Sequence, residues 1–248
     1  EADIPLAGLP PAMDGLRVLL ITDIHTGPFL SQRALQRTFL RLSELRPDVI
    51  LLGGDHTTSH VADFLSCRDA FASLQAPLGV YGVLGNHDHY TEDPPRLERV
   101  MEEAGIRMLQ NRAVPLEREG SRVILAGIDD MNAGRPDLDA AVSQAEELRE
   151  GTDAPIVLLS HNPDIFFQAA RRGVALVLSG HTHGGQIRLP GLPVLVRMSR
   201  YHLDQGRYTA HGAELVVSRG LGASGIPLRL GCSPEVGLFR LRRPSDTH

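Results

Sequence analysis

The first half of the chain alternates short apolar runs with stretches of helical periodicity. The apolar runs are rich in leucine and β-branched residues, which is typical of strands buried on both faces. Strands are predicted over residues 17–22, 48–52 and 80–84. Helices are predicted over residues 31–45, 61–74 and 95–104, the first with a serine N-cap and the third with prolines at its start.

The second half is richer in strands. Residues 113–117 and 122–127 flank Glu119-Gly120 and predict a hairpin. Further strands are expected at 156–160, 174–179 and 214–218, with helices at 137–149 and 163–172. Short strands and turns rich in glycine and proline follow Gln186. This order predicts an α/β protein in which two sheets share one core with helices outside. We expect residues 1–248 to form a single domain, with residues 1–15 as an extended lead-in.

The composition is that of a soluble globular protein, since 42% of the 248 residues are hydrophobic and 22% are charged. The formal net charge of -5 argues weakly against a nucleic-acid-binding surface, so no nucleic acid is expected as a partner. All 25 basic residues are arginine, which excludes Schiff-base chemistry and a Walker-type phosphate lysine. Cys67 and Cys232 are isolated and indicate neither a disulfide scaffold nor a zinc ribbon.

No apolar run approaches the roughly 18–20 residues that span a bilayer. The chain begins at Glu1 rather than Met. We therefore expect a further segment upstream, such as a signal peptide or a membrane anchor.

Polar side chains follow five of the predicted strands at their carboxyl ends, where ligand sites lie in open α/β sheets. The donors among them are carboxylate, amide and imidazole groups: Asp23, His25, Asp55, Asn86, His161, His181 and His183. Such oxygen and nitrogen donors, with no thiolate, suit Mn²⁺, Fe, Zn²⁺ or Mg²⁺. Because seven donors are too many for one tetrahedral ion, the set indicates two ions that share a carboxylate.

Strand geometry offers one way for these donors to converge. Because residues i and i+2 of a strand point to one side, Asp23 with His25 and His181 with His183 are each expected to face the same site. A lone strand-end histidine such as His161 is more often structural, and only its place in the five blocks favours the metal interpretation.

The five blocks resemble the calcineurin-like metallophosphoesterases. The series D-x-H, G-D, G-N-H-D, H and G-H-T-H runs from Asp23 to His183 in the order and roughly the spacing of that superfamily. The flanks HNPD, SGHTHGGQIRLP and VSRGLGASGIPLR resemble small bacterial phosphodiesterases that often carry an export signal or membrane anchor. That branch includes enzymes similar to UDP-2,3-diacylglucosamine pyrophosphohydrolase. The resemblance implies a four-layer α/β/β/α sandwich of two mixed sheets.

The resemblance also implies the role of each residue. One ion would be bound by Asp23, His25 and His183, the other by Asn86, His161 and His181, and Asp55 would bridge both. His87 would contact the phosphoryl oxygens and help to protonate the leaving oxygen, while Asp88 would orient the His87 imidazole. Mn²⁺ is the preferred ion, with Fe, Zn²⁺ and Mg²⁺ as alternatives.

The mechanism expected from such a site follows from charge. Two cations would lower the pKa of a bridging water and hold the resulting hydroxide in line with phosphorus. They would also neutralise the charge that the phosphoryl oxygens carry in the transition state. No nucleophile from the protein is then needed.

Three further residues are substrate-binding candidates. His56 and His89 adjoin ligand motifs and could line the substrate pocket, whereas a solvent-facing or polar role is the default. Arg219 could bind a substrate phosphate, and an ordinary place in a surface turn is an equally good interpretation of this residue. Relatives commonly have G-D-L-V-D where this chain has G-D-H-T-T, which leaves the substrate preference near that loop open.

Other motifs are set aside. Residues 220–225 fit G-x-G-x-x-G, but Ile226-Pro227 follows in place of a helix, which argues against dinucleotide binding. Ser160 and His161 lack the G-x-S-x-G context of a serine hydrolase. Residues 187–203 mix apolar residues with arginines; core or connecting structure is the commoner explanation, and a flap that receives acyl chains is the alternative.

We therefore expect a metal-dependent phosphoesterase that hydrolyses a phosphodiester or pyrophosphate bond, on a nucleotide-sugar-lipid such as UDP-2,3-diacylglucosamine. A phosphomonoesterase or protein phosphatase of the same superfamily is the alternative, and a metal-free binding scaffold a more remote one. A bacterial protein with peripheral membrane association at the cell envelope is expected, with the cytoplasm as the alternative, and the oligomeric state is left open.

Overall fold

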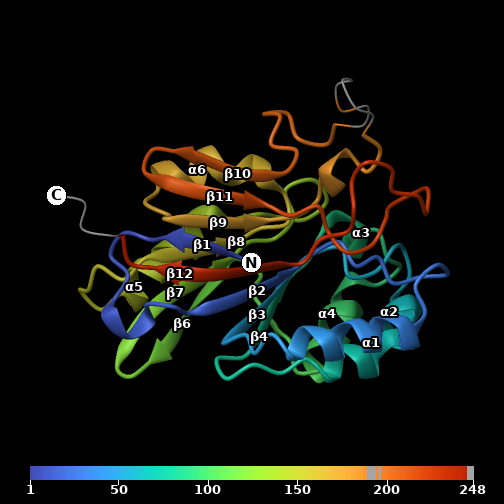
Figure 1. Ribbon diagram of the computed structural model, residues 1–248, viewed down its shortest axis with the longest axis horizontal. Coiled ribbons are helices and arrows are strands. Elements are labelled where there is room, and N and C mark those ends of the chain that lie inside the picture. The colour runs from blue at the N-terminus through green and yellow to red at the C-terminus, as the bar shows by residue number, and fades with distance from the viewer. Residues whose placement is uncertain (189–193, 195–196, 245–248) are drawn as a thin grey trace.

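Two six-stranded sheets pack face to face in the computed structural model, which describes residues 1–188, 194 and 197–244 (Figure 1). The first sheet has the order β1-β12-β2-β3-β4-β5. Its strands are β1 (Ala2–Pro5), β12 (Gly237–Arg242), β2 (Arg17–Ile21), β3 (Val49–Gly53), β4 (Val80–Val83) and β5 (Arg107–Met108). All neighbours run parallel except β12 and β2, so this sheet is mixed.

The second sheet has the order β10-β11-β9-β8-β7-β6. Its strands are β10 (Gly206–Ala210), β11 (Ala213–Val217), β9 (Leu176–Ser179), β8 (Ile156–Leu159), β7 (Ser121–Gly127) and β6 (Arg112–Arg118). The four central strands are parallel, and an antiparallel strand closes each edge.

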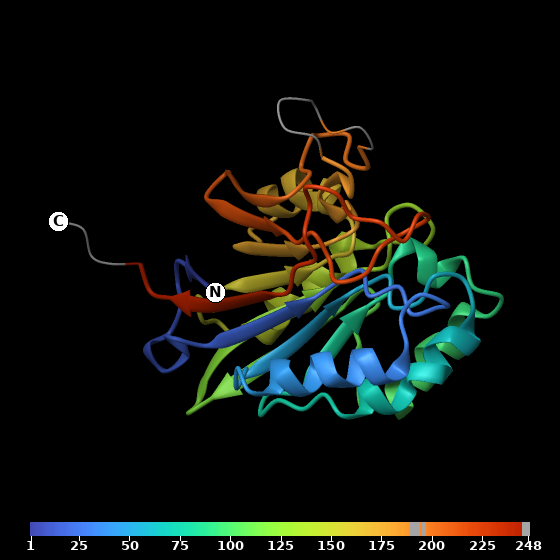
Figure 2. The ribbon, with the colours of Figure 1, turned by 45° about the vertical axis from the view of Figure 1, so that its right-hand side comes forward.

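Helices cover the outer face of each sheet, as Figure 2 shows from the side. On the first sheet lie α1 (Gln32–Ser43), α2 (Val61–Ala72) and α4 (Pro94–Glu103), and on the second lie α5 (Leu138–Leu148) and α6 (Phe166–Arg171). The short helix α3 (Asn86–His89) and the 3-10 turns η1 (Pro11–Met13), η2 (Pro163–Ile165) and η3 (His183–Gly185) lie in connections. The predicted α/β/β/α sandwich of two mixed sheets is confirmed.

The alternation of side chains along buried strands divides the core into three layers. In β2, Val18 and Leu20 pack between the sheets, while Leu19 and Ile21 pack under the helices. A strand buried on both faces has no polar side, which explains the continuous apolar runs of the sequence. The layer under the helices of the first sheet is built around Phe39, Phe64 and Phe71.

The elements predicted from periodicity are present, with ends that differ by at most two residues. The expected helix over 163–172 divides into η2 and α6. The expected lead-in over residues 1–15 is partly a strand, because β1 pairs in parallel with β12. Strands β1, β5, β10 and β12 and helix α3 were not predicted individually, since they are short or follow no clear period.

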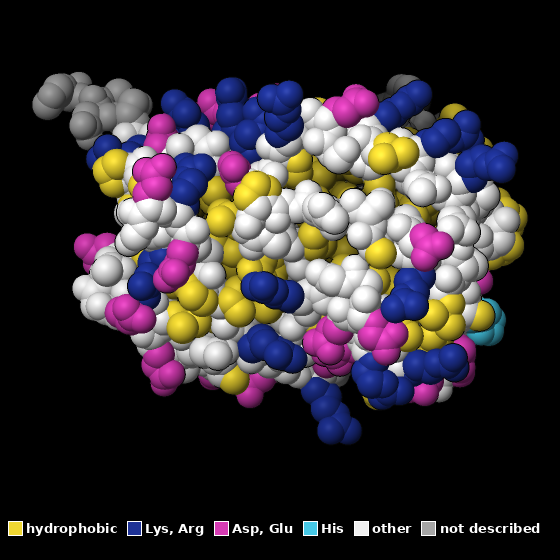
Figure 3. All heavy atoms as spheres, turned by 90° about the horizontal axis from the view of Figure 1, so that it is seen from below, with side chains coloured by type: hydrophobic (Ala, Val, Ile, Leu, Met, Phe, Trp, Pro, Cys, Tyr) yellow, Lys and Arg dark blue, Asp and Glu magenta, His cyan; other side chains and the backbone are white. Residues whose placement is uncertain are grey.

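The surface of the lower face in Figure 1 carries both charges. Arginine and acidic side chains are interspersed there around hydrophobic side chains at the centre (Figure 3). The described residues of this face therefore present no continuous basic surface.

Candidate metal centre

The seven candidate ligands come together at the carboxyl ends of the parallel strands of both sheets. Asp23 and His25 follow β2, Asp55 follows β3, and Asn86 follows β4. His161 follows β8, and His181 and His183 follow β9. All seven side chains are buried. The carboxyl edges of both sheets thus contribute to one site.

Left-handed backbone, and not strand alternation, makes the donors converge. The φ angles of Asp23, His25, Asp55, His181 and His183 are 52°, 50°, 53°, 71° and 52°. Such values are uncommon for residues other than glycine and concentrate at functional sites, where the surrounding structure maintains the strain. The expectation that extended strands direct Asp23/His25 and His181/His183 to one side is therefore wrong, because each pair lies beyond its strand.

The first cluster consists of Asp23, His25, Asp55 and His183, whose donor atoms all lie within 4.8 Å of one another. Nε2 of His25 lies 3.0 Å from Nε2 of His183 and 3.5 Å from Oδ2 of Asp55. Nε2 of His183 lies 3.5 Å from Oδ1 of Asp23. Donors that share an ion at about 2.0–2.2 Å lie roughly 3 Å apart, so this spacing fits a metal ion.

The second cluster adjoins the first through Asp55. Nε2 of His161 lies 3.3 Å from Oδ2 of Asp55 and 3.2 Å from Nδ1 of His181. Asn86 lines the same cavity as Asp55 and His181, and its Oδ1 is buried without a hydrogen-bond partner among the described residues. A buried amide oxygen without a partner is costly unless a cation or another donor meets it. The oxygen and imidazole donors therefore fit a second divalent ion.

Glycine is required where ligands approach the main chain. A Cβ on Gly85 would lie 2.2 Å from Oδ1 of Asp55, and one on Gly180 would lie 2.3 Å from Oδ2 of Asp23. No side chain tolerates such separations, so the carboxylates pack directly against these two residues.

Burial keeps three of the imidazoles neutral. It lowers the pKa of His25 to about 4, against the opposing charge of Asp55. Burial and the adjacent His161 lower the pKa of His181 to about 4, and burial with the charge of Arg229 lowers the pKa of His183 to about 3. Their ring nitrogens are therefore available as metal ligands at neutral pH.

Asp55 and His161 form a buried ion pair. Burial acts to raise the pKa of Asp55, but the charge and hydrogen bond of His161 outweigh it and hold that pKa well below its usual value. Burial likewise acts to lower the pKa of His161, and Asp55 raises it to about 10. Metal binding at His161 must therefore release a proton.

Neighbouring groups orient the ligand rings. Nδ1 of His161 lies 2.8 Å from the carbonyl oxygen of Gly53, so Nδ1 keeps a proton and Nε2 is the nitrogen that a metal ion would deprotonate and bind. The side-chain amide of Asn132 meets Nε2 of His181 at 3.3 Å, and Nη2 of Arg229 meets Nδ1 of His183 at 3.1 Å. Asn132 and Arg229 were not predicted: Asn132 matches no motif, and the resemblance of the flank VSRGLGASGIPLR assigned no role to its last residue, Arg229.

His87 is held by groups other than the one expected. Its Nδ1 lies 2.8 Å from the carbonyl oxygen of Thr58, and its Nε2 lies 3.1 Å from Oγ of Ser224. Asp88 instead accepts hydrogen bonds from Nδ1 of His56 at 2.8 Å and from the main-chain N–H groups of His56, Thr57 and Gly85. The expectation that Asp88 orients His87 is wrong, because these four donors occupy its buried carboxylate.

The three substrate-binding candidates all have protein partners. His56 is fully buried against Asp88 and Phe71 and does not line the cavity. His89 pairs with Asp129 at 2.6 Å, and Arg219 pairs with Glu235 at 2.6 Å. None of the three is among the described residues that line the cavity, which corrects their expected place in the pocket.

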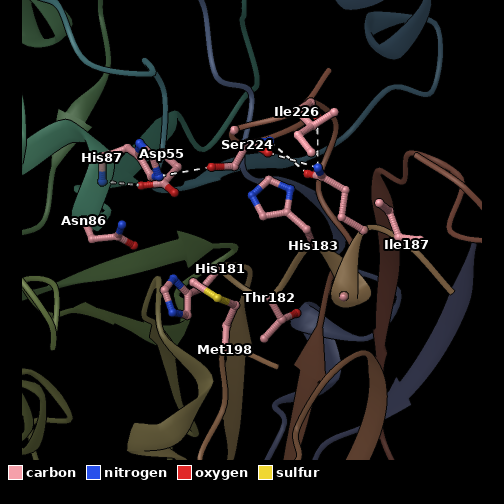
Figure 4. Close-up of a pocket in the computed structure, with 13 residues that line it drawn as sticks. Asp55, Asn86, His87, His181, Thr182, His183, Ile187, Met198, Ser224 and Ile226 are labelled. Atoms are coloured by element: carbon pink, nitrogen blue, oxygen red, sulfur yellow. Dashed lines mark hydrogen bonds between the residues drawn. The ribbon is translucent and has the colours of Figure 1, made fainter. Parts of the chain in front are cut away.

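A cavity of about 300 Å³ opens over the two clusters (Figure 4). Asp55, His87 and Ser224 lie on one side of it, and His181 and Met198 on the other. Ile187, Met198 and Ile226 give it an apolar wall beside the ligands. Much of the segment 187–203, for which an acyl-binding flap was the alternative, lies outside the described residues.

No helix in residues 1–188, 194 and 197–244 is both long enough and apolar enough to cross a membrane.

The sequence is similar to known phosphoesterases over most of its length. The family model of calcineurin-like phosphoesterases matches residues 16–185. Over 243 residues the chain is 35% identical to a Danio rerio protein named transmembrane protein with metallophosphoesterase domain, and the match covers 95% of this chain and 55% of that protein. It is 30% identical over 249 residues to the Bacillus subtilis (strain 168) protein named uncharacterized metallophosphoesterase YkuE, a match that covers 98% of this chain and 84% of that protein. The chain thus spans about half the length of the fish relative.

Solved structures share the fold. The NAD nucleotidase of Haemophilus influenzae superposes with a TM-score of 0.53 at 16% identity, covering 83% of this chain and 45% of that one. A dimetal phosphatase from Danio rerio superposes with a TM-score of 0.50 at 13% identity, covering 84% of this chain and 88% of that one. At these identities the likeness concerns the arrangement of sheets and helices.

Proposed function

The chain belongs to the calcineurin-like phosphoesterase family, and from that membership we propose that it hydrolyses a phosphodiester or pyrophosphate bond at a dinuclear metal site. The observation that carries the proposal is the pair of ligand clusters joined at Asp55, whose Oδ2 lies 3.5 Å from Nε2 of His25 and 3.3 Å from Nε2 of His161. One carboxylate oxygen thus faces an imidazole of each cluster.

Each cluster would hold one divalent ion. The first ion would be bound by Asp23, His25 and His183, the second by Asn86, His161 and His181, with Asp55 shared. When bound, such ions acidify water and offset the negative charge of a phosphoryl group. Oxygen and imidazole nitrogen donors suit Mn²⁺, Fe, Zn²⁺ and Mg²⁺, and Mn²⁺ is the ion we favour among them.

His87 is the group proposed to act on the leaving oxygen. The carbonyl oxygen of Thr58 can only accept a hydrogen bond, so Nδ1 of His87 carries a proton and Nε2 faces the cavity. From that position Nε2 of the doubly protonated ring would donate its proton to the departing oxygen, which leaves the ring neutral with the remaining proton on Nδ1. The main-chain N–H of His87 donates to Oδ1 of Asp55 at 2.9 Å, which fixes the ring close to the proposed bridging carboxylate.

The charge around the cavity favours a diester over a monoester. The described residues that line it include no arginine. Arg229 donates to main-chain carbonyls, and Arg219 pairs with Glu235. A monoester dianion would gain from additional cationic groups, whereas a diester carries one charge and a second substituent that an apolar wall can receive.

A lipid-linked substrate such as UDP-2,3-diacylglucosamine is the finer proposal. Ile187, Met198 and Ile226 place apolar surface beside the ligands, and Ile226 is 60% exposed. Large exposed aliphatic side chains at a binding site favour an apolar ligand group. The name of the fish relative refers to a transmembrane protein, which agrees with an envelope- or membrane-associated role for this chain.

A panel of substrates with Mn²⁺ tests the proposal. Rates on bis(p-nitrophenyl) phosphate, p-nitrophenyl phosphate and UDP-2,3-diacylglucosamine separate the diesterase, monoesterase and pyrophosphohydrolase activities. We expect the diester or the pyrophosphate to be the better substrate. A higher kcat/KM on the monoester would assign the chain to the phosphomonoesterases, and no turnover on any of the three with full metal content would indicate a binding scaffold.

A further inference from the structure

The hydroxyl of Ser224 lies 3.1 Å from Nε2 of His87, the ring nitrogen that faces the cavity. Ser224 belongs to the connection between β11 and β12, far from His87 in the sequence. Figure 4 shows the two side chains joined by a hydrogen bond on the same side of the cavity as Asp55. This contact gives the ring a second support opposite the carbonyl oxygen of Thr58.

The position of Ser224 is set by the side-chain amide of Gln186. Oε1 of Gln186 accepts from the main-chain N–H of Ser224 at 2.9 Å. Nε2 of Gln186 donates to the carbonyl oxygens of Ser224 and Ile226, each at 2.9 Å. The side-chain amide of Gln186 thus forms three hydrogen bonds with main-chain groups that have no strand partner. These bonds hold the irregular segment around Ser224 in one conformation.

Gln186 is fixed in turn to the first ligand cluster. Its main-chain N–H donates to the carbonyl oxygen of His183 at 3.0 Å, and its φ angle is 53°. A left-handed conformation at a residue other than glycine costs free energy and persists where the surrounding contacts require it. The strain at Gln186 directs its side chain toward the connection that carries Ser224.

A second pair of hydrogen bonds anchors the same connection on its other side. The main-chain N–H of Leu221 donates to the carbonyl oxygen of Thr22 at 2.9 Å, and that of Gly222 donates to the carbonyl oxygen of Asp23 at 2.7 Å. The connection is therefore tied both to the segment of Asp23 and to the segment of His183. Ser224 belongs to the anchor on Gln186 and follows the anchor at Gly222 by two residues, which gives its hydroxyl a defined place in the site.

We propose that Ser224 is a positioning residue for the His87 imidazole, placed by Gln186, and that it matters most for substrates whose leaving group must be protonated. The inference rests on the proposed function. An alkoxide leaves poorly unless it receives a proton, whereas p-nitrophenolate leaves without one. Hydrolysis of a dialkyl diester therefore requires that Nε2 of His87 points toward the leaving oxygen, whereas hydrolysis of an aryl diester does not require it.

The test compares two diesters in the metal-loaded protein. Ser224→Ala removes the hydroxyl but keeps the main-chain N–H that Gln186 binds. For a glycerophosphodiester we expect kcat to fall about tenfold or more at an unchanged KM, whereas kcat for bis(p-nitrophenyl) phosphate changes less than about twofold. Ser224→Thr should restore the first rate, and Ser66→Ala on an exposed turn of α2 should leave both rates unchanged.

A second variant tests the support of Ser224. Gln186→Ala removes the three hydrogen bonds and should reproduce the Ser224→Ala pattern, with the melting temperature measured alongside. Equal losses on both diesters, or a change in KM alone, would overturn the positioning role. A burst of product with phosphate bound covalently to Ser224 would also overturn it, because Ser224 would then be a nucleophile.

Different results would overturn the proposed function and the positioning role of Ser224. An active wild-type protein with an unaffected Ser224→Ala variant would overturn only the positioning role. A wild-type protein that turned over neither diester with Mn²⁺ bound would overturn the proposed diesterase function and the inference with it.

Discussion

Oδ2 of Asp88 lies 2.8 Å from Nδ1 of His56, so this carboxylate joins the loop that follows β3 to the short helix α3 that follows β4. The same carboxylate accepts the main-chain N–H of His56 at 2.9 Å and that of Gly85 at 2.9 Å. Because the loop carries Asp55 and α3 carries His87, the geometry of the site depends on Asp88, a buried residue that does not line the cavity.

Asp88→Ala should therefore lower the stability of the folded protein. It leaves four buried N–H donors without their acceptor, and we expect the free energy of unfolding to fall by about 3–5 kcal/mol. Urea denaturation followed by circular dichroism measures this change. A variant as stable as the wild type would contradict the structural role.

His87→Ala should lower the rate of hydrolysis and leave the stability of the folded protein nearly unchanged. Among the described residues, the ring forms hydrogen bonds only with the carbonyl oxygen of Thr58 and the hydroxyl of Ser224. We expect kcat for a dialkyl diester to fall about 10²–10⁴-fold while the free energy of unfolding changes by less than about 1 kcal/mol. Rates and denaturation curves on the same preparation check both expectations, and an unchanged rate would remove His87 from the reaction.

Gly85→Ala should disrupt the site by steric overlap. The new Cβ would lie 2.2 Å from Oδ1 of Asp55 and 2.5 Å from its main-chain nitrogen, so the loop must shift. We expect a loss of about 1–3 kcal/mol in the free energy of unfolding together with a lower metal content. Gly105→Ala is the control, because its φ of 88° is strained for alanine but, apart from the adjoining backbone, no described residue has an atom within 4 Å of the added Cβ.

The ion pair of His89 and Asp129 should make stability depend on pH. Burial opposes the charge on His89, but its bond to Asp129 raises the pKa of His89 above 6.5. Burial likewise opposes the charge on Asp129, and His89 lowers the pKa of Asp129 below 3.8. The pair thus contributes fully to the free energy of unfolding between pH 3.8 and pH 6.5, the ordinary pKa values of the two groups. This contribution is lost as pH rises through the pKa of His89 in the folded protein, or as pH falls through the pKa of Asp129 in the folded protein.

His89→Gln should accordingly destabilise the protein by about 1 kcal/mol near pH 5.5 and by less near pH 9. Denaturation curves at the two pH values measure the difference, with His211→Gln in the exposed β10–β11 turn as the control. A destabilisation by His89→Gln that grows with pH would contradict a raised pKa of His89 in the folded protein.

Much of the fold and most of the site composition followed from the sequence. The apolar runs of β2, β3, β8 and β9 are long enough to identify, and a carboxylate or an imidazole follows each within two residues. The strand β12 could not be anticipated, because its pairing with β2 and β1 joins residues more than two hundred positions apart. Long-range pairings of this kind leave no local periodicity.

The geometry of the site could not be predicted in the same way. The left-handed backbone of Asp23 and His183 follows from packing around the site, since neither residue type requires it. Ser224 and Arg229 lie in the flank VSRGLGASGIPLR, whose resemblance assigned neither of them a role, and Asn132 lies in a connection that matches no motif. Only the folded chain shows which of them contact the histidines.

The measurement that tests the central claim most directly is the titration of Mn²⁺ into the metal-stripped protein while hydrolysis of bis(p-nitrophenyl) phosphate is followed. The two clusters predict no turnover without metal, saturation at about two equivalents per chain, and loss of both turnover and the bound pair of ions in Asp55→Asn. Turnover that survives complete removal of metal, or that saturates at one equivalent and persists in Asp55→Asn, would contradict a dinuclear centre bridged by Asp55.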